Sequence, residues 1–248
     1  SKTEVKAAGP AIKGIASGKI EISSIVFSLK TLLALSSLLN LLLSKSISIE
    51  IINKIIELNF YTDYLEIGIN NGLCFDQINC SKKTGVDPNS DHSTHKMTSD
   101  DFFNALKPED KFDIIFIDGS HLEMQVDKDI ENSIKHLKEN GTIILHDCNP
   151  PSEYHAKENI YFGAPIFGEW NGTVYKSLVK IRSKRNDLTL TTVDTDFGVG
   201  ILTKEPSETI KNHSDTWEFF DTNRKEILNL ITKKKDHFTP ASQLDYMP

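Results

Sequence analysis

The sequence predicts an α/β fold: a doubly wound, mostly parallel sheet of seven strands that ends in an antiparallel hairpin, with an N-terminal helical extension. Short apolar runs alternate with helix-like segments from Tyr61 onward, which is typical of a parallel sheet covered by helices. The run Phe112–Ile117 is apolar almost throughout, as a central parallel strand should be. Two later strand-like runs are joined by Asp194-Thr195-Asp196, a connection typical of a hairpin.

Composition and charge exclude several classes of protein. The chain has 248 residues, of which 38% are hydrophobic and 25% are charged, as in an ordinary globular protein. The net charge of −7 argues against a general nucleic-acid-binding surface. Cys74, Cys80 and Cys148 are scattered and give neither a disulfide framework nor paired zinc spacing. We therefore expect a protein of the reducing cytoplasm.

Residues 1–60 are expected to form an arm and a helical cap. Ile25–Leu43 is the most apolar segment and approaches transmembrane length. Lys30 and Asn40 interrupt it, however, and a second apolar helical pattern follows at residues 47–58. We expect two helices that cover the sheet or a second subunit. The chain would then have no membrane span and would form a homo-oligomer through these helices if a subunit is what they cover.

Residues 61–205 are expected to form the main domain. Its strands are predicted at Tyr64–Ile69, Lys83–Val86, Lys96–Ser99, Phe112–Ile117, Thr142–Leu145, Leu188–Val193 and Phe197–Leu202. Helices are predicted after the first strand up to about Cys80, and at residues 100–106, 125–138 and 173–183. Asn140-Gly141 suits the C-terminal cap of the third of these helices.

Two further segments complete the predicted organisation. Residues 149–172 form a long irregular stretch rich in proline and glycine, and such loops are usually lids or binding loops. Residues 206–248 are expected to be a C-terminal segment that is helical up to about residue 235 and ends in a tail.

The turn after the first strand is expected to hold a ligand. Glu66-x-Gly68-x-Asn70-x-Gly72 ends that strand, and glycine there lets the backbone approach a ligand closely. Asn70 stands where a glycine is often found, and asparagine tolerates the left-handed backbone better than most residues. Asp87 ends the next strand, where a carboxylate can bind ribose hydroxyls.

Two cofactor classes use this geometry. Dinucleotides place a pyrophosphate on the helix N-terminus and prefer G-x-G-x-x-G, which this turn lacks. S-adenosylmethionine carries an amino group and a sulfonium, and an acidic Glu66 suits such a cationic ligand. The plain alternative is a glycine-containing turn with no ligand, as occurs in many α/β proteins.

Polar residues also end the two central strands. Asp118 and His121 follow one strand, and His146, Asp147 and Asn149 follow the next. Facing carboxylates repel each other unless a proton or a cation lies between them, and Asp118, Asp147 and Asn149 suit Mg²⁺ or a similar ion. The alternative is that both aspartates cap loops.

The histidines and the third strand end supply the remaining candidates. His121 could accept a proton near pH 7, and His146 could share that role or be structural. Ser99 or Asp100 could contact the adenine rim of a cofactor, or could cap the helix that starts there.

These motifs resemble a known family. Glu66-x-Gly68-x-Asn70-x-Gly72 with Val86-Asp87-Pro88, IDGSH at Asp118, ENGTIILHDCNPP and EWNGTVYKSLVKIR resemble class I S-adenosylmethionine-dependent methyltransferases. The closest likeness is to the metal-assisted O-methyltransferases of sugars and small molecules, over roughly residues 60–203. The resemblance implies a Rossmann-like sheet, Asp118 as a metal ligand near the cofactor, and His121 as the general base. Catechol-type members have lysine in place of His121 and Asp-Asn in place of Asp147-Cys148, which leaves the third ligand open.

The predicted function is methyl transfer from S-adenosylmethionine to a hydroxyl of a small polar acceptor, such as a sugar, assisted by a divalent cation such as Mg²⁺. Two alternatives stay open. An NAD-dependent oxidoreductase would use the same sheet, although Glu66 and Asn70 speak against it. A non-catalytic binding or assembly module could retain the fold, although intact Asp118, His121 and Asp147 speak against that.

Overall fold

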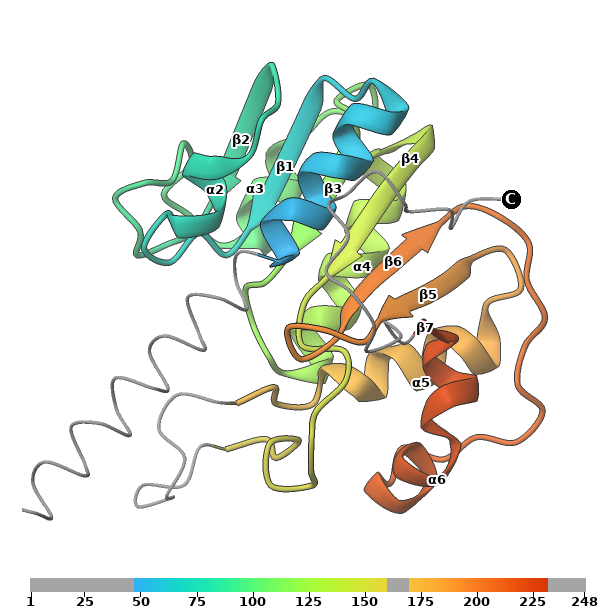
Figure 1. Ribbon diagram of the computed structural model, residues 1–248. Coiled ribbons are helices and arrows are strands. Elements are labelled where there is room, and N and C mark those ends of the chain that lie inside the picture. Colours follow the sequence, from blue (N-terminus) through green and yellow to red (C-terminus); the bar gives the residue numbers. More distant parts are fainter. Residues whose placement is uncertain (1–46, 160–169, 232–248) are drawn as a thin grey trace, which may run out of the picture.

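The computed structural model describes residues 47–159 and 170–231. Within them, one seven-stranded sheet runs in the order β2-β1-β3-β4-β6-β5-β7 (Figure 1). The strands are β1 (Asp63–Ile67), β2 (Lys82–Val86), β3 (Phe112–Ile117), β4 (Leu137–Leu145), β5 (Thr189–Val193), β6 (Val199–Thr203) and β7 (Leu230–Ile231). The strands β2, β1, β3 and β4 are parallel, and β6 is antiparallel to both β4 and β5. The predicted fold, a mostly parallel sheet with an antiparallel hairpin, is confirmed.

Alternate residues of the central strands feed two separate cores. Leu65, Ile115 and Ile143 face one core, whereas Tyr64, Phe116 and Ile144 face the other. This alternation follows from the two-residue period of a strand, and both faces of the sheet are therefore apolar. The first core is covered by α3 (Ser99–Ala105), α4 (Glu123–His136), α5 (Val174–Lys184) and α6 (Trp217–Leu228), and the second by α2 (Leu73–Gln77) and the helical residues 47–59.

The outermost strands differ from the prediction. Lys96–Ser99 is not a strand: the chain makes only a single parallel bridge there, between Val86 and His95. Thr98 caps α3 instead, because its side chain accepts a hydrogen bond of 3.1 Å from the backbone N–H of Asp101. The seventh strand is β7, which lies within the segment predicted to be helical and pairs with β5.

The junction between α4 and β4 also differs from the prediction. The helix was expected to reach Lys138 and to be capped by Asn140-Gly141, but it ends at His136 and the chain becomes extended at Leu137. Leu137 is only 2% exposed, so burial of its side chain favours the extended turn into the sheet. Gly141 lies within β4, where an added Cβ would come within 2.8 Å of the Leu137 side chain and the Asp113 carbonyl.

The terminal segments are described only in part. The predicted helix Ile25–Leu43 lies outside the described residues, whereas the second N-terminal helix covers the sheet with Ile49, Ile52 and Ile56, as predicted. Residues 47–159 and 170–231 include no helix that is long and apolar enough to cross a membrane. The predicted lid, residues 149–172, is described up to residue 159 and again from residue 170.

Candidate active site

The glycine turn has the backbone that its sequence predicts. Gly68 has φ 92°, Asn70 has φ 50° and Gly72 has φ 77°. A Cβ on Gly68 would lie 2.3 Å from the backbone oxygen of Asp118, so only glycine allows the ends of β1 and β3 to touch here. A Cβ on Gly72 would lie 2.4 Å from the His92 ring. The turn is therefore packed closely on both sides by backbone and side chain.

Asp87 braces this turn. One carboxylate oxygen accepts hydrogen bonds from the backbone N–H groups of Ile69 (3.0 Å) and Asn70 (2.9 Å). The other accepts from Asn89 (2.7 Å) and Ser90 (2.9 Å). Burial would raise the pKa of Asp87, but these four donors lower it below its usual value. A carboxylate has about four acceptor sites, so binding of ribose hydroxyls, which stays a prediction, would require some of these bonds to be exchanged.

Glu66 lies beneath the turn and is only 1% exposed. Its carboxylate accepts a hydrogen bond from the hydroxyl of Tyr64. Burial raises the pKa of the neighbouring Cys74 thiol, and the charges of Glu66 and Asp118 raise it further. The predicted contact with the methionine end of a cofactor remains a prediction, and in this structure Glu66 is part of a buried hydrogen-bonded cluster.

Ser99 and Asp100 take part in a polar network at the start of α3. The side-chain amide of Gln125 donates to Ser99 (3.2 Å), to Asp100 (2.9 Å) and to Asp129 (3.1 Å). Burial raises the pKa of Asp129 to about 6. Lys128 pairs with Asp100 at 3.0 Å. The network joins α3 to α4 and leaves contact with an adenine rim as a prediction for both residues.

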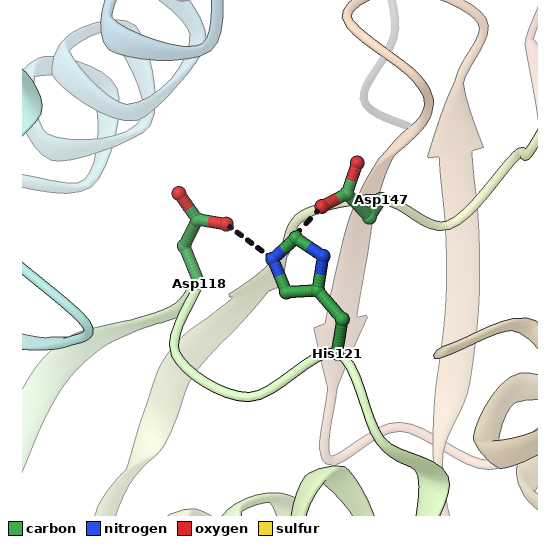
Figure 2. Close-up of side chains that lie close together, drawn as sticks. All are labelled: Asp118, His121 and Asp147. Atoms are coloured by element: carbon green, nitrogen blue, oxygen red, sulfur yellow. Dashed lines mark ion pairs between the residues drawn. The ribbon is translucent and has the colours of Figure 1, made fainter. Parts of the chain in front are cut away.

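Asp118, His121 and Asp147 come together at the carboxyl ends of β3 and β4 (Figure 2). The Nε2 atom of His121 lies 3.3 Å from Asp147 Oδ2 and 3.8 Å from Asp118 Oδ1. One ligand atom from each of the three residues lies within 4.8 Å of the other two. The ring of His121 therefore stands between the two carboxylates that the sequence places at neighbouring strand ends.

Trp170 fixes the ring of His121. The backbone oxygen of Trp170 lies 2.7 Å from His121 Nδ1, and the indole ring stacks on the imidazole at 5.0 Å. With Nδ1 donating to this carbonyl, Nε2 of the neutral ring is the nitrogen without a proton. Burial would lower the pKa of His121, but the hydrogen bond to Asp118 and the charge of Asp147 raise it above the usual 6.5.

His146 is held on both sides. Its Nδ1 lies 3.3 Å from both Asp118 Oδ1 and Asp147 Oδ2, and its Nε2 lies 3.2 Å from Asp196 Oδ2. The hydroxyl of Ser48 donates to the same Asp196 oxygen. Burial would lower the pKa of His146, but the carboxylates of Asp118 and Asp147 raise it well above its usual value. In turn, the two imidazoles outweigh the burial of Asp118 and hold its pKa well below its usual range.

Asn149 and Asn171 hold different parts of the site, and the metal-ligand role of Asn149 stays a prediction. The side-chain oxygen of Asn149 accepts a hydrogen bond from Arg224, and its amide donates to Asp194 at 2.8 Å, so Asn149 ties the end of β4 to α6. Asn171, which sequence reasoning missed, donates to Asp147 Oδ1 at 2.7 Å and is only 1% exposed. Asn171 belongs to EWNGTVYKSLVKIR, one of the stretches that resemble the methyltransferase family.

The donor set fits a divalent cation. Asp118 and Asp147 offer carboxylate oxygens and His121 offers an imidazole nitrogen. The side-chain oxygen of Asn171 is buried and has no hydrogen-bond partner among the described residues. Carboxylate and amide oxygens suit Mg²⁺ or Mn²⁺, whereas an imidazole is a more usual ligand of Zn²⁺ or Fe²⁺. Cys148 is no candidate ligand or nucleophile here, because burial raises the pKa of its thiol to about 12.

The sheet order, the hairpin and the glycine turn define a Rossmann-like fold of the class I methyltransferase type. Residues 65–148 match the model of a family described as a methyltransferase domain. This segment contains the glycine turn and both strand-end motifs. The prediction that the chain resembles class I methyltransferases is therefore confirmed.

Solved structures share the fold at low sequence identity. Cofactor-bound Rv0187 from MTB aligns over 69% of this chain and 91% of its own, with a TM-score of 0.50 and 11% identity. An O-methyltransferase from Bacillus cereus in complex with SAH aligns over 68% of this chain and 91% of its own, with a TM-score of 0.48 and 14% identity. At such identities the likeness to Rv0187 shows the fold alone. No curated protein sequence matches the chain.

Proposed function

We propose that this protein transfers a methyl group from S-adenosylmethionine to a hydroxyl of a small polar acceptor, such as a sugar, with the help of a divalent cation. The observation that carries the proposal is the convergence of Asp118, His121 and Asp147 beside the glycine turn. The close packing of Gly68 on the Asp118 backbone puts the cofactor turn and this cluster at one edge of the sheet.

The methyltransferase domain match supports S-adenosylmethionine over NAD. The turn has Asn70 in the left-handed region where dinucleotide-binding turns prefer glycine. Glu66, Gly68, Asn70 and Gly72 are assigned to the methionine end of the cofactor. Asp87 is assigned to the ribose, and Ser99 and Asp100 to the adenine rim, with Asp118 beside the methyl group.

His121 is the proposed base. Its Nε2 is the free nitrogen of the neutral ring and faces the space between Asp118 and Asp147, where an acceptor hydroxyl would lie. A positioned base of this kind typically contributes 10²–10⁴ in rate. A divalent cation bound by the two carboxylates would lower the pKa of the acceptor hydroxyl and orient it. His146, anchored by Asp196, is next in line as the base.

We also propose a cellular location, a domain organisation and an oligomeric state for the protein. All three cysteines are free, which suits a reducing cytoplasm. We propose the division that the sequence predicts: an N-terminal arm and cap up to residue 60, a methyltransferase domain over residues 61–205, and a C-terminal segment after it. A homo-oligomer through the N-terminal helices is proposed because the apolar stretch at residues 25–43 requires cover.

Calorimetry and turnover in the presence of a chelator test the proposal together. S-adenosylhomocysteine should bind and NAD should not. Excess EDTA should abolish methyl transfer but leave S-adenosylhomocysteine binding intact, and Mn²⁺ or Mg²⁺ should restore the activity. Asp118→Asn should behave like the chelated enzyme. Binding of NAD without any response to S-adenosylhomocysteine would refute the cofactor assignment, and full activity in EDTA would remove the cation.

A further inference from the structure

His146 is a buried histidine at the candidate site that has no assigned step in the proposed methyl transfer. It directly follows β4, its side chain is only 9% exposed, and its ring packs edge-on against Phe116 at 6.3 Å. The ring therefore lies on the face of the sheet that the N-terminal helix, residues 47–59, covers. Buried polar atoms normally have partners, so the surroundings of its two nitrogens indicate what this residue does.

The Nε2 atom of His146 is held by an anchored carboxylate. It lies 3.2 Å from Asp196 Oδ2, and the side chain of Asp196 is only 1% exposed. The hydroxyl of Ser48, which belongs to the N-terminal helix, donates to the same oxygen. When Nε2–H donates to Asp196, Nδ1 is the nitrogen of the neutral ring that carries the lone pair.

The Nδ1 atom of His146 faces the two carboxylates that the sequence predicts to be metal ligands. It lies 3.3 Å from Asp118 Oδ1 and 3.3 Å from Asp147 Oδ2. It is nevertheless a buried atom that forms no hydrogen bond of acceptable geometry with any residue that the structure describes. Such atoms are rare and require an explanation. A hydrogen bond needs an N–H that points at one oxygen, whereas a nitrogen that shares a cation with both oxygens needs only to lie close to them.

The separations of these atoms fit the ligands of one cation. Metal–nitrogen and metal–oxygen bonds of about 2.0–2.2 Å place adjacent ligand atoms about 2.8–3.6 Å apart, and both distances from Nδ1 fall in that range. One oxygen of Asp118 and one of Asp147 lie within 4.8 Å of each other. Two carboxylates balance the charge of a divalent cation, and a neutral imidazole adds a ligand without adding charge.

His121 is the better base and the poorer ligand of the two histidines. Its Nε2 lies at unequal distances from the carboxylates, 3.3 Å from Asp147 and 3.8 Å from Asp118, and its side chain is 22% exposed. Metal-bound histidines usually donate their other N–H to a carboxylate or a carbonyl, which both rings do. Exposure separates them, because a base must reach the acceptor whereas a ligand is best buried. The more buried ring is that of His146.

We propose that His146 Nδ1 is the third ligand of the cation, together with Asp118 and Asp147, and that Asp196 and Ser48 hold the ring in place for this role. The N-terminal helix then contributes a residue to the active site as well as covering the sheet. A nitrogen ligand favours a transition metal such as Zn²⁺ or Fe²⁺ over Mg²⁺. The inference rests on the proposed function, in which the two carboxylates bind the cation.

Electron spin-echo spectroscopy of the full-length protein loaded with Mn²⁺ tests the ligand, because it detects the nitrogen of an imidazole bound to the ion. The wild type should show nitrogen modulation, His121→Gln should retain it, and His146→Gln should lose it. Bound Mn²⁺ without nitrogen modulation in the wild type overturns the inference. Modulation that is lost in His121→Gln but kept in His146→Gln also overturns it, because His121 is then the ligand.

The affinity for Mn²⁺ tests the outer residues. Asp196→Asn should weaken Mn²⁺ binding about 10–100-fold, as loss of the outer partner of a metal-bound histidine usually does, and Ser48→Ala should weaken it less. Asp194→Asn is the matched control, because Asp194 lies on the same turn but contacts Asn149, and it should leave the affinity unchanged. Equal affinities in Asp196→Asn and Asp194→Asn overturn the positioning role of Asp196.

The preference among metals gives an independent readout. Zn²⁺ should displace Mn²⁺ from the wild type at a much lower concentration than Mg²⁺ does, and His146→Gln should lose most of this preference for Zn²⁺. An unchanged preference in a folded His146→Gln overturns the inference. If that variant does not fold, the spectra of the wild type and His121→Gln and the affinity of Asp196→Asn decide.

The proposed function is judged separately. S-adenosylhomocysteine binding, measured by calorimetry, involves none of the residues changed here. A protein that binds S-adenosylhomocysteine but no Mn²⁺ overturns the ligand inference and leaves the methyltransferase assignment standing. A protein that binds Mn²⁺ through His146 but no S-adenosylhomocysteine refutes the cofactor assignment and leaves the metal ligand standing.

Discussion

The two halves of the sheet edge are built differently. At the ends of β1 and β2, the glycine turn is held by backbone amides that converge on a single side chain, Asp87. At the ends of β3 and β4, side chains hold one another: His146 joins Asp118 and Asp147 to Asp196, and Asn171 holds Asp147.

This difference separates binding from chemistry. A turn whose backbone amides are fixed by hydrogen bonds is held in one geometry, which suits it to binding a cofactor. A cluster of coupled carboxylates and imidazoles can change its protonation and can exchange protons with a substrate. We therefore expect changes in the first half to affect stability and cofactor binding, and changes in the second half to affect turnover.

The largest effect is expected at His121. His121→Ala should lower turnover by about 10²–10⁴-fold, because it removes a positioned base, while S-adenosylhomocysteine binding stays within error of the wild type. Steady-state kinetics and calorimetry measure the two. His213→Ala, an exposed histidine on a loop, is the control. Equal loss of cofactor binding would mean that the two halves are not separate. If instead Mn²⁺ binding is lost, His121 serves as a ligand.

The next largest effect is expected from replacing Asn171, and Asn149 provides the comparison. Asn171→Ala frees the carboxylate of Asp147 and should lower activity or Mn²⁺ affinity by about 10–100-fold, as loss of a residue that orients a ligand usually does. Asn149→Ala removes the contact with Arg224 and should lower the unfolding temperature with little change in Mn²⁺ affinity. Titration of Mn²⁺ by electron paramagnetic resonance distinguishes them. The reverse pattern would return the ligand role to Asn149.

Asp87→Ala should act on the first half of the edge. It removes the acceptor of four backbone amides, and one such charge-assisted bond contributes about 1.5–3 kcal/mol. Because the pKa of Asp87 is lowered in the fold, its contribution is present above the unfolded value and is lost as pH falls. Wild type and variant should therefore differ in chemical unfolding at pH 7 and converge in acid. A constant difference down to pH 2 would contradict this account.

The smallest effect is a shift of one titration. Asp118 and Asp147 raise the pKa of His121, so the protonated ring stabilises the fold below the unfolded value and that contribution is lost as pH rises through the folded value. In metal-free protein, the NMR titration midpoint of His121 should lie above 6.5, and in Asp118→Asn it should move down. An unchanged midpoint in the variant would show that Asp118 does not act on the ring.

The sequence predicted the backbone-held half better than the side-chain half. The pattern of Gly68 and Asn70 predicts the local backbone conformation, because that conformation depends on neighbouring residues. In the structure both residues have the positive φ that the pattern predicts. Asp196 and Asn171 could not be found this way, because they reach His146 and Asp147 from distant segments and are ordinary loop residues in sequence. The predicted strand at Lys96–Ser99 was wrong because this polar segment has no apolar face to bury in the sheet.

The direct junction of α4 and β4 has an evolutionary consequence. His121 precedes α4, Asp147 follows β4, and no loop separates His136 from Leu137. Between Thr142 and Leu145, β4 pairs with both β3 and β6 without interruption, so an inserted residue that shifted this register would turn the inward side chains to the opposite face and carry Asp147 away from His121. Descendants of this chain are free to vary the sequence across the junction, but we expect them to keep its length.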